Sequence, residues 1–123
     1  PAAGDMFGGR ALSVGRVVNW APSILLFVLA NGVREEIMFR GLLLSSFSGV
    51  LGTRASVLVT SLVFALAHVG VTYTPQVPVF LVVTFLLGVV FAAVTLKGGS
   101  LWGAALLHAG ADIPVIVGIF SGL

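Results

Sequence analysis

Four long apolar stretches, separated by short turns, take up most of this chain. They run from about residue 17 to 47, 54 to 69, 79 to 96 and 101 to 119. A helix that spans a bilayer needs roughly 20 mostly apolar residues, and glycine and proline residues mark the breaks between the stretches. This layout predicts an all-α fold, a polytopic transmembrane bundle whose core is these helices.

The charge content supports a membrane setting. Only 8% of the residues are charged, and the mean hydropathy is +1.19. Soluble domains carry roughly 25% charged residues, so this chain has too few to cover a water-exposed surface. Its six basic residues form no run, which argues against nucleic-acid binding. We expect a multi-pass integral membrane protein, in a bacterial or archaeal cytoplasmic membrane.

The domain organisation follows from the same pattern. Residues 1–16 read as a polar, glycine-rich lead-in, and residues 17–123 as one transmembrane core. The first apolar stretch forms either one long helix or two short ones that break at Asn31–Gly32. Because neither half reaches the length of a span, one long helix is favoured. In the last stretch, Pro114 should loosen or kink the helix just past Asp112.

Ionisable residues inside the predicted helices point to a functional site. Each charge within a bilayer costs at least ~2.5 kcal/mol, and a purely structural bundle has no need of several. We therefore expect these side chains to face the bundle interior: Arg34, Glu35, Glu36, Arg40, His68, His108 and Asp112.

The helical rise predicts that four of these residues meet. Depth is counted from the end of the bundle that holds the turns beside Arg54 and Lys97. On that count Glu35 lies about 20 Å deep, His68 about 21 Å, Asp112 about 18 Å and His108 about 12 Å. Since the helices run in alternating directions, sequence spacing did not build in this agreement, and a shared site is geometrically possible.

The spacing on the first helix separates two carboxylates by role. Glu36 and Arg40 are four residues apart, in the favourable order for a helical ion pair. Glu35 points about 100° away around the helix and is left free for general-base work on water. The structural alternatives are a buried Glu36–Arg40 pair without catalysis, and a His68 that merely bonds a neighbouring helix.

Three motifs carry a family resemblance. The segment "EEIMFR" fits EExxxR, "FALAH" fits FxxxH, and "HAGAD" fits Hxxx(N/D). In this order on successive membrane helices, over about residues 33–112, they resemble the CPBP intramembrane proteases. These include the type II CAAX prenyl endopeptidases and their bacterial Abi relatives. The resemblance implies a membrane endopeptidase in which Glu36 and Arg40 support the first helix. Its partners would be the bilayer and a protein or peptide with a membrane-embedded or lipidated end, possibly of prenylated CAAX type.

The resemblance also implies catalytic roles. Glu35 would be the base that activates water, and His68 would help to hold that water. His108 and Asp112 would stabilise the oxyanion of the tetrahedral intermediate. Many relatives have Asn at the position of Asp112, and an ionised Asp cannot donate a hydrogen bond to an oxyanion. Three interpretations stay open: Asp112 is protonated, orients His108, or binds a metal.

A metal cofactor is the next open point. Glu35, His68 and His108 supply ligand types suited to a catalytic Zn²⁺, with one position left for water. The chain has no HExxH helix, and the depth count sets His108 about 9 Å shallower than His68. A metalloprotease and a metal-independent, glutamate-activated water fit the sequence equally well.

Other functional classes compete with proteolysis. A catalytically idle immunity or binding protein would keep the same fold. A proton-coupled carrier would use Glu35, His108 and Asp112 as a relay. A bis-histidine haem protein would use His68 and His108 but would give Glu35 no role.

Overall fold

The computed structural model describes the backbone of residues 14–121 and the side chains of residues 14–119. Within that range the chain is helical apart from its turns, which confirms the predicted all-α fold. Three helices are long and apolar enough to cross a membrane, and a fourth apolar helix is shorter. This is the layout of a polytopic integral membrane protein.

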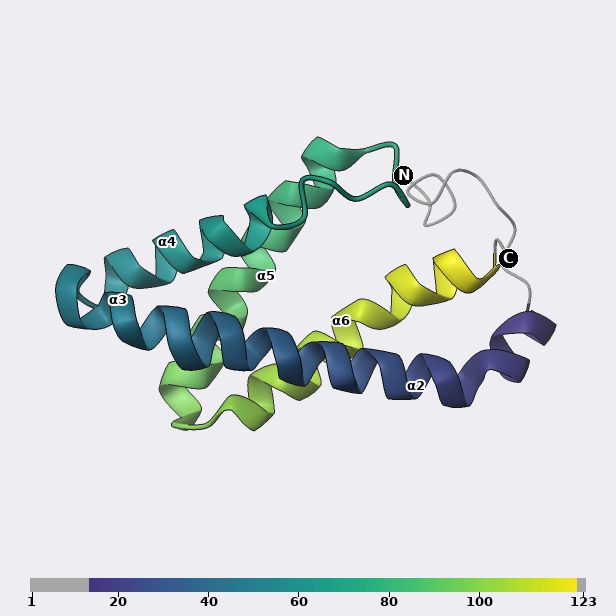
Figure 1. Ribbon diagram of the computed structural model, residues 1–123, viewed down its shortest axis with the longest axis horizontal. Coiled ribbons are helices and arrows are strands. Elements are labelled where there is room, and N and C mark those ends of the chain that lie inside the picture. Colours follow the sequence, from purple (N-terminus) through teal and green to yellow (C-terminus); the bar gives the residue numbers. More distant parts are fainter. Residues whose placement is uncertain (1–13, 122–123) are drawn as a thin grey trace.

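The first membrane helix is one continuous rod, as expected, and does not break at Asn31–Gly32 (Figure 1). It consists of α2 (Val14–Glu36), the π-helical segment η1 (Ile37–Leu43) and α3 (Leu44–Leu51). Residues 14–16, expected in the lead-in, form its first turn, and the rest of the lead-in lies outside the described residues.

Three further helices follow: α4 (Thr53–Leu66), α5 (Val77–Gly98) and α6 (Leu101–Ser121). Gly52 and Gly99 make the turns before α4 and after α5 with φ angles of 75° and 63°, a region that favours glycine. The helix of α4 ends earlier than the pattern suggested. The His68 N–H bonds to the Ala65 carbonyl, three residues back, so the chain tightens into a turn and His68 lies just past the helix.

Helix packing depends on small residues. The main pairs are α2 with α6 and α4 with α5, and Figure 1 shows α5 passing behind the rod of α2 and α3. A Cβ atom at Gly32 would lie 2.7 Å from the Ala105 carbonyl oxygen, so only glycine allows this backbone approach of α2 and α6. Around the site, the buried core is a cluster of Phe39, Phe64, Phe91 and Ala104.

Polar and apolar side chains are distributed as in a membrane protein. Fully buried side chains include Glu36, Ser56, Thr60 and Ser61. The outward-facing side chains are largely apolar, among them Leu26, Leu42, Leu62, Val82 and Trp102. Such a surface suits contact with lipid.

Candidate active site

Glu36 is the centre of a buried ion-pair network that joins three helices. Its Oε1 accepts a hydrogen bond from Arg40 Nη1 at 2.9 Å, as the spacing predicted, and another from His108 Nδ1 at 2.7 Å. Arg40 also donates through Nη2 to the Gly88 carbonyl at 2.9 Å. The Arg40 and Glu36 side chains are both 0% exposed. The network therefore fixes His108 of α6 and Gly88 of α5 relative to the first rod.

Phenylalanine rings enclose the Arg40 charge. Its Cζ atom lies 4.5 Å from the ring centroid of Phe64 and 5.2 Å from that of Phe91. Phe91 also stacks on the His108 ring at 4.7 Å and 15°, and the Phe64 edge contacts His68 at 4.9 Å. Phe64 and His68 stand four residues apart in the FxxxH motif, so one helical turn accounts for their contact. The sequence did not single out Phe91 or the Gly88 carbonyl, because the one ionisable residue of α5, Lys97, lies in its last turn and away from the site.

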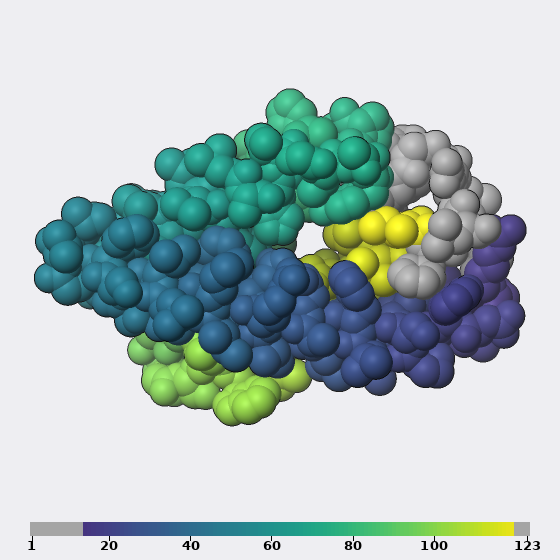
Figure 2. Space-filling view, viewed as in Figure 1, coloured from purple at the N-terminus to yellow at the C-terminus, as the bar shows by residue number. Residues whose placement is uncertain are grey.

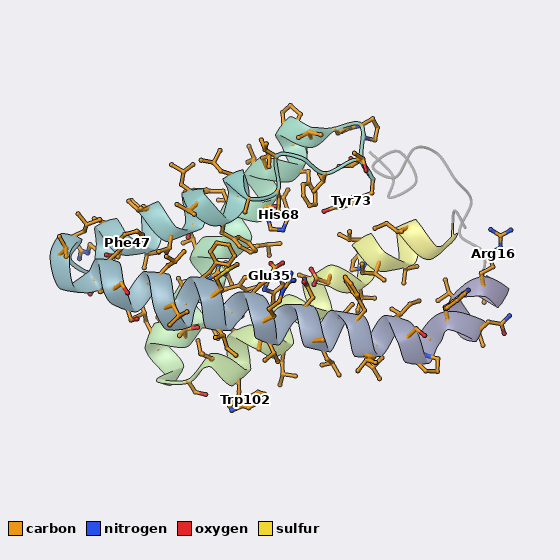
Figure 3. All side chains as sticks on the ribbon, in the orientation of Figure 1. Arg16, Glu35, Phe47, His68, Tyr73 and Trp102 are labelled. Carbon is orange, nitrogen blue, oxygen red and sulfur yellow. The ribbon has the colours of Figure 1, made fainter. Side chains whose placement is uncertain are left out.

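The two histidines converge on Glu35. Its Oε2 lies 3.5 Å from His108 Nε2 and 4.0 Å from His68 Nε2, and Figure 3 shows His68 above Glu35 at the middle of the bundle. This Oε2 atom is buried and accepts no hydrogen bond from the described residues. The expected 9 Å difference in depth between the histidines is wrong. Counting along each helix assumed parallel axes, whereas α6 runs obliquely to the rod of α2 and α3 (Figure 1).

The second ring nitrogen of each histidine fixes its tautomer. His108 Nδ1 faces the Glu36 carboxylate, and His68 Nδ1 lies 2.8 Å from the Phe64 carbonyl oxygen. Both partners only accept, so each Nδ1 carries a hydrogen and each neutral ring presents a lone pair at Nε2. These two lone pairs and Glu35 Oε2 therefore face one another without a donor among them. That arrangement calls for a water molecule, a proton or a metal ion.

Asp112 belongs to a second chain of contacts. Its Oδ1 lies 3.7 Å from His108 Nε2, and its Oδ2 accepts a hydrogen bond from Asn31 Nδ2 at 2.9 Å. Arg34 Nη2 donates to Asn31 Oδ1 at 2.9 Å and to Glu35 Oε1 at 3.3 Å. Asn31 was considered only as a helix break. A polar residue four positions before Glu35, on the same helix face, was the signal that could have identified it.

A cavity of about 260 Å³ opens beside these residues. Figure 2 shows the surface hollowed between the 67–76 loop and the C-terminal half of α6. Burial and the charges of Asp112 and Glu35 raise the pKa of Tyr73, a loop residue that the sequence did not single out, to about 12. Apolar side chains form most of the wall, which consists of Phe64, His68, Tyr73, Phe80, Val83, Thr84, Leu87, Phe91, His108, Ala111, Asp112, Pro114 and Val115.

The chemistry of the site atoms indicates whether a metal ion could bind here. Among the described residues, no group of three or more His, Cys, Asp and Glu side chains forms a ready-made metal site. The chemistry of the converging atoms nevertheless fits a divalent cation. Glu35, His68 and His108 each present a lone pair, and each imidazole is oriented through its other nitrogen as metal-bound histidines are. A bound Zn²⁺ would supply a more acidic water.

Comparison with known families identifies the family of this chain. Residues 17–114 match the family described as Type II CAAX prenyl endopeptidase Rce1-like. This range contains all three motifs, and the match confirms the resemblance on which the expected fold and activity depend. No curated protein and no solved structure matches the chain significantly.

Proposed function

Because the chain belongs to the Rce1-like family of type II CAAX prenyl endopeptidases, we propose that it is an intramembrane endopeptidase that uses a Glu35-activated water. One observation carries the mechanism. Glu35 Oε2 is buried without a hydrogen-bond donor and faces the Nε2 atoms of His68 and His108 at 4.0 and 3.5 Å. A water molecule placed there would donate to these acceptors and direct its own lone pair towards the cavity.

The reaction follows from that placement. Glu35 takes a proton from the water as the water oxygen attacks the peptide carbonyl carbon, which gives a tetrahedral oxyanion. The other water hydrogen stays on the attacking oxygen and is hydrogen-bonded to His68 Nε2. When the C–N bond breaks, the leaving amine takes the proton from Glu35, and the carboxylate is restored. His108 also faces the reacting carbonyl, and a ring that carried a hydrogen on both nitrogens would donate to the oxyanion through Nε2.

Glu36 and Arg40 act as positioning residues in this proposal. Their side chains are fully buried, and the polar contacts of the Glu36 carboxylate are to Arg40 and His108. Arg40 orients the Glu36 carboxylate, and Glu36 orients the His108 ring through Nδ1. Asp112, held by Asn31, supports His108 from the other side.

The substrate proposal rests on the family and on the cavity wall. We propose a membrane-associated protein whose lipidated or membrane-embedded end enters the largely apolar cavity, with prenylated CAAX-type ends as the first candidates. A bacterial or archaeal cytoplasmic membrane is the proposed location. A divalent metal held by Glu35, His68 and His108 would serve the same step and is tested by chelation.

The test compares wild type with Glu35→Gln and Glu36→Gln in detergent and in liposomes. The substrates are a prenylated CAAX peptide and a mixed set of membrane peptides, each with and without a chelator. Glu35→Gln should lose about 10²–10⁴-fold in rate, the range for a removed general base, while staying folded. Glu36→Gln should lose activity together with stability. Asp112→Asn, which introduces the residue common in relatives, should remain active.

Two results would contradict the proposal. One is a well-folded wild type that cleaves none of the peptides. The other is Glu35→Gln at the wild-type rate, which would remove Glu35 from the chemistry. Activity lost on chelation and restored by Zn²⁺ would assign the water to a metal, and activity that is insensitive to the chelator would assign it to Glu35 alone.

A further inference from the structure

The proposed site is rich in hydrogen-bond acceptors and poor in donors. Among the described side chains that line the cavity, the polar ones are His68, Tyr73, Thr84, His108 and Asp112. A tetrahedral oxyanion needs donors aimed at the position where its charge develops. The donor must therefore be a side chain with a hydrogen that is not already bonded to another acceptor.

Most of the five have no hydrogen to offer. The Thr84 hydroxyl donates to the Phe80 carbonyl at 2.8 Å. His68 uses its Nδ1–H on the Phe64 carbonyl, and its neutral ring has a lone pair at Nε2. Ionised Asp112 only accepts. His108 donates through Nε2 only when its ring is protonated, so the neutral donor left over is the Tyr73 hydroxyl.

Tyr73 is held beside the site by the loop that follows His68. Within that loop Val71 N–H bonds to the His68 carbonyl at 3.3 Å. The Tyr73 ring meets Phe80 edge to face at 5.5 Å, and in Figure 3 Tyr73 lies beside His68. The phenol is half-buried on the cavity wall that also holds Asp112.

We propose that the Tyr73 hydroxyl is a catalytic hydrogen-bond donor to the oxyanion of the tetrahedral intermediate. No covalent bond to Tyr73 forms, and its proton stays on the phenol oxygen. The proposal rests on the proposed proteolysis and adds the donor that Asp112 cannot supply when ionised. A pKa of about 12 keeps the phenol protonated across the working pH range, so the donor is always present.

The first test is Tyr73→Phe, which removes only the hydroxyl and keeps the ring contact with Phe80. We expect kcat to fall by about 10²-fold, as when an oxyanion donor is removed, while KM stays within about twofold because the ground-state carbonyl is bound by other groups. The matched control is Thr60→Val. It removes a buried hydroxyl of α4 that bonds only to its own helix and does not line the cavity.

A second measurement separates donation from structure. Tyr73 is the single tyrosine of the chain, so growth on 3,5-difluorotyrosine alters this position alone. The fluorinated phenol ionises at lower pH and stops donating there, so the alkaline limb of the kcat profile should move to lower pH. A merely structural tyrosine would leave that limb where it is.

The outcomes distinguish this inference from the proposed function. If wild type cleaves and Glu35→Gln does not, an unchanged kcat in Tyr73→Phe overturns the role of Tyr73 alone. If kcat falls but the difluorotyrosine profile does not shift, the hydroxyl acts structurally and the proposal is equally wrong. A wild type without activity removes both proposals.

Discussion

His68 and His108 are oriented in the same way by chemically different acceptors. Each ring donates through Nδ1, His68 to a neutral backbone carbonyl and His108 to the Glu36 carboxylate. A hydrogen bond to a carboxylate is charge-assisted and is stronger than one to a neutral carbonyl. The His108 ring is therefore held more firmly than the His68 ring, although both present Nε2 to Glu35.

The two neighbouring glutamates should differ sharply in their effect on stability. Glu36→Gln leaves the fully buried Arg40 charge without its carboxylate, and breaking a buried pair in this way costs about 3–5 kcal/mol. Glu35→Gln loses the ion pair with the exposed Arg34, while its side-chain amide can still face His68 and His108, so it should change stability little. Thermal unfolding in detergent measures both. A Glu36→Gln protein as stable as wild type would mean that Arg40 finds another partner or water.

The raised pKa of Tyr73 gives a direct optical prediction. In the folded protein the tyrosinate absorbance near 295 nm should rise with a midpoint of about pH 12, and after unfolding with one of about 10. The facing charged groups are Asp112 of α6 and Glu35 of α2, with His68 beside it. Because folding raises this pKa, the contribution of Tyr73 to stability is complete below pH ~10 and is lost as the pH rises towards 12. The Tyr73→Phe variant should lose less stability than wild type between pH 10 and 12. An absorbance midpoint near pH 10 in the folded protein would contradict the prediction, because it would mean that the phenol is solvated.

At the level of helices, sequence patterns predicted the contacts that repeat with the helical turn. The Glu36–Arg40 pair follows from its four-residue spacing, and so does the contact of Phe64 with His68. Contacts made by the backbone of α5 could not be predicted from side-chain patterns. The Gly88 carbonyl accepts a hydrogen bond from Arg40, and glycine has no side chain that would indicate this contact. Tilt between helices is equally invisible in sequence, which is why the depth of His108 was misjudged.

The approach of α2 and α6 is a feature of whole helices that one methyl group should disrupt. In Gly32→Ala, the new Cβ would meet the Ala105 carbonyl oxygen at 2.7 Å and the Ala109 nitrogen at 3.1 Å, so the helices must separate. We expect a loss of about 1–3 kcal/mol from overpacking and a drop in activity, because His108 moves with α6. Gly49→Ala, with nothing within 4 Å, is the control and should stabilise α3 by up to about 1 kcal/mol. Equal unfolding temperatures for the two variants would contradict this account of the packing.

In the molecule as a whole, the site lies where one membrane helix is too short. The 14 residues of α4 extend about 21 Å, against about 30 Å for the hydrocarbon core of a bilayer. The 67–76 loop, with His68 and Tyr73, therefore lies below the membrane surface. This shortfall brings polar side chains to the depth of Glu35, although α4 carries no charged residue beyond its first turn.

Cysteine labelling tests this arrangement, because the natural chain has no cysteine and each introduced thiol is unique. Thr53→Cys and Thr72→Cys stand at opposite ends of α4, and both positions are exposed. In sealed vesicles a membrane-impermeant maleimide should reach each from a different side, position 53 from the cytoplasmic one, since Arg54 and Lys97 lie at that end. Position 72 should react several-fold more slowly, because its loop lies beneath the interface. Labelling of both from one side would mean that α4 re-enters the membrane instead of crossing it, and the site would then open towards the cytoplasm.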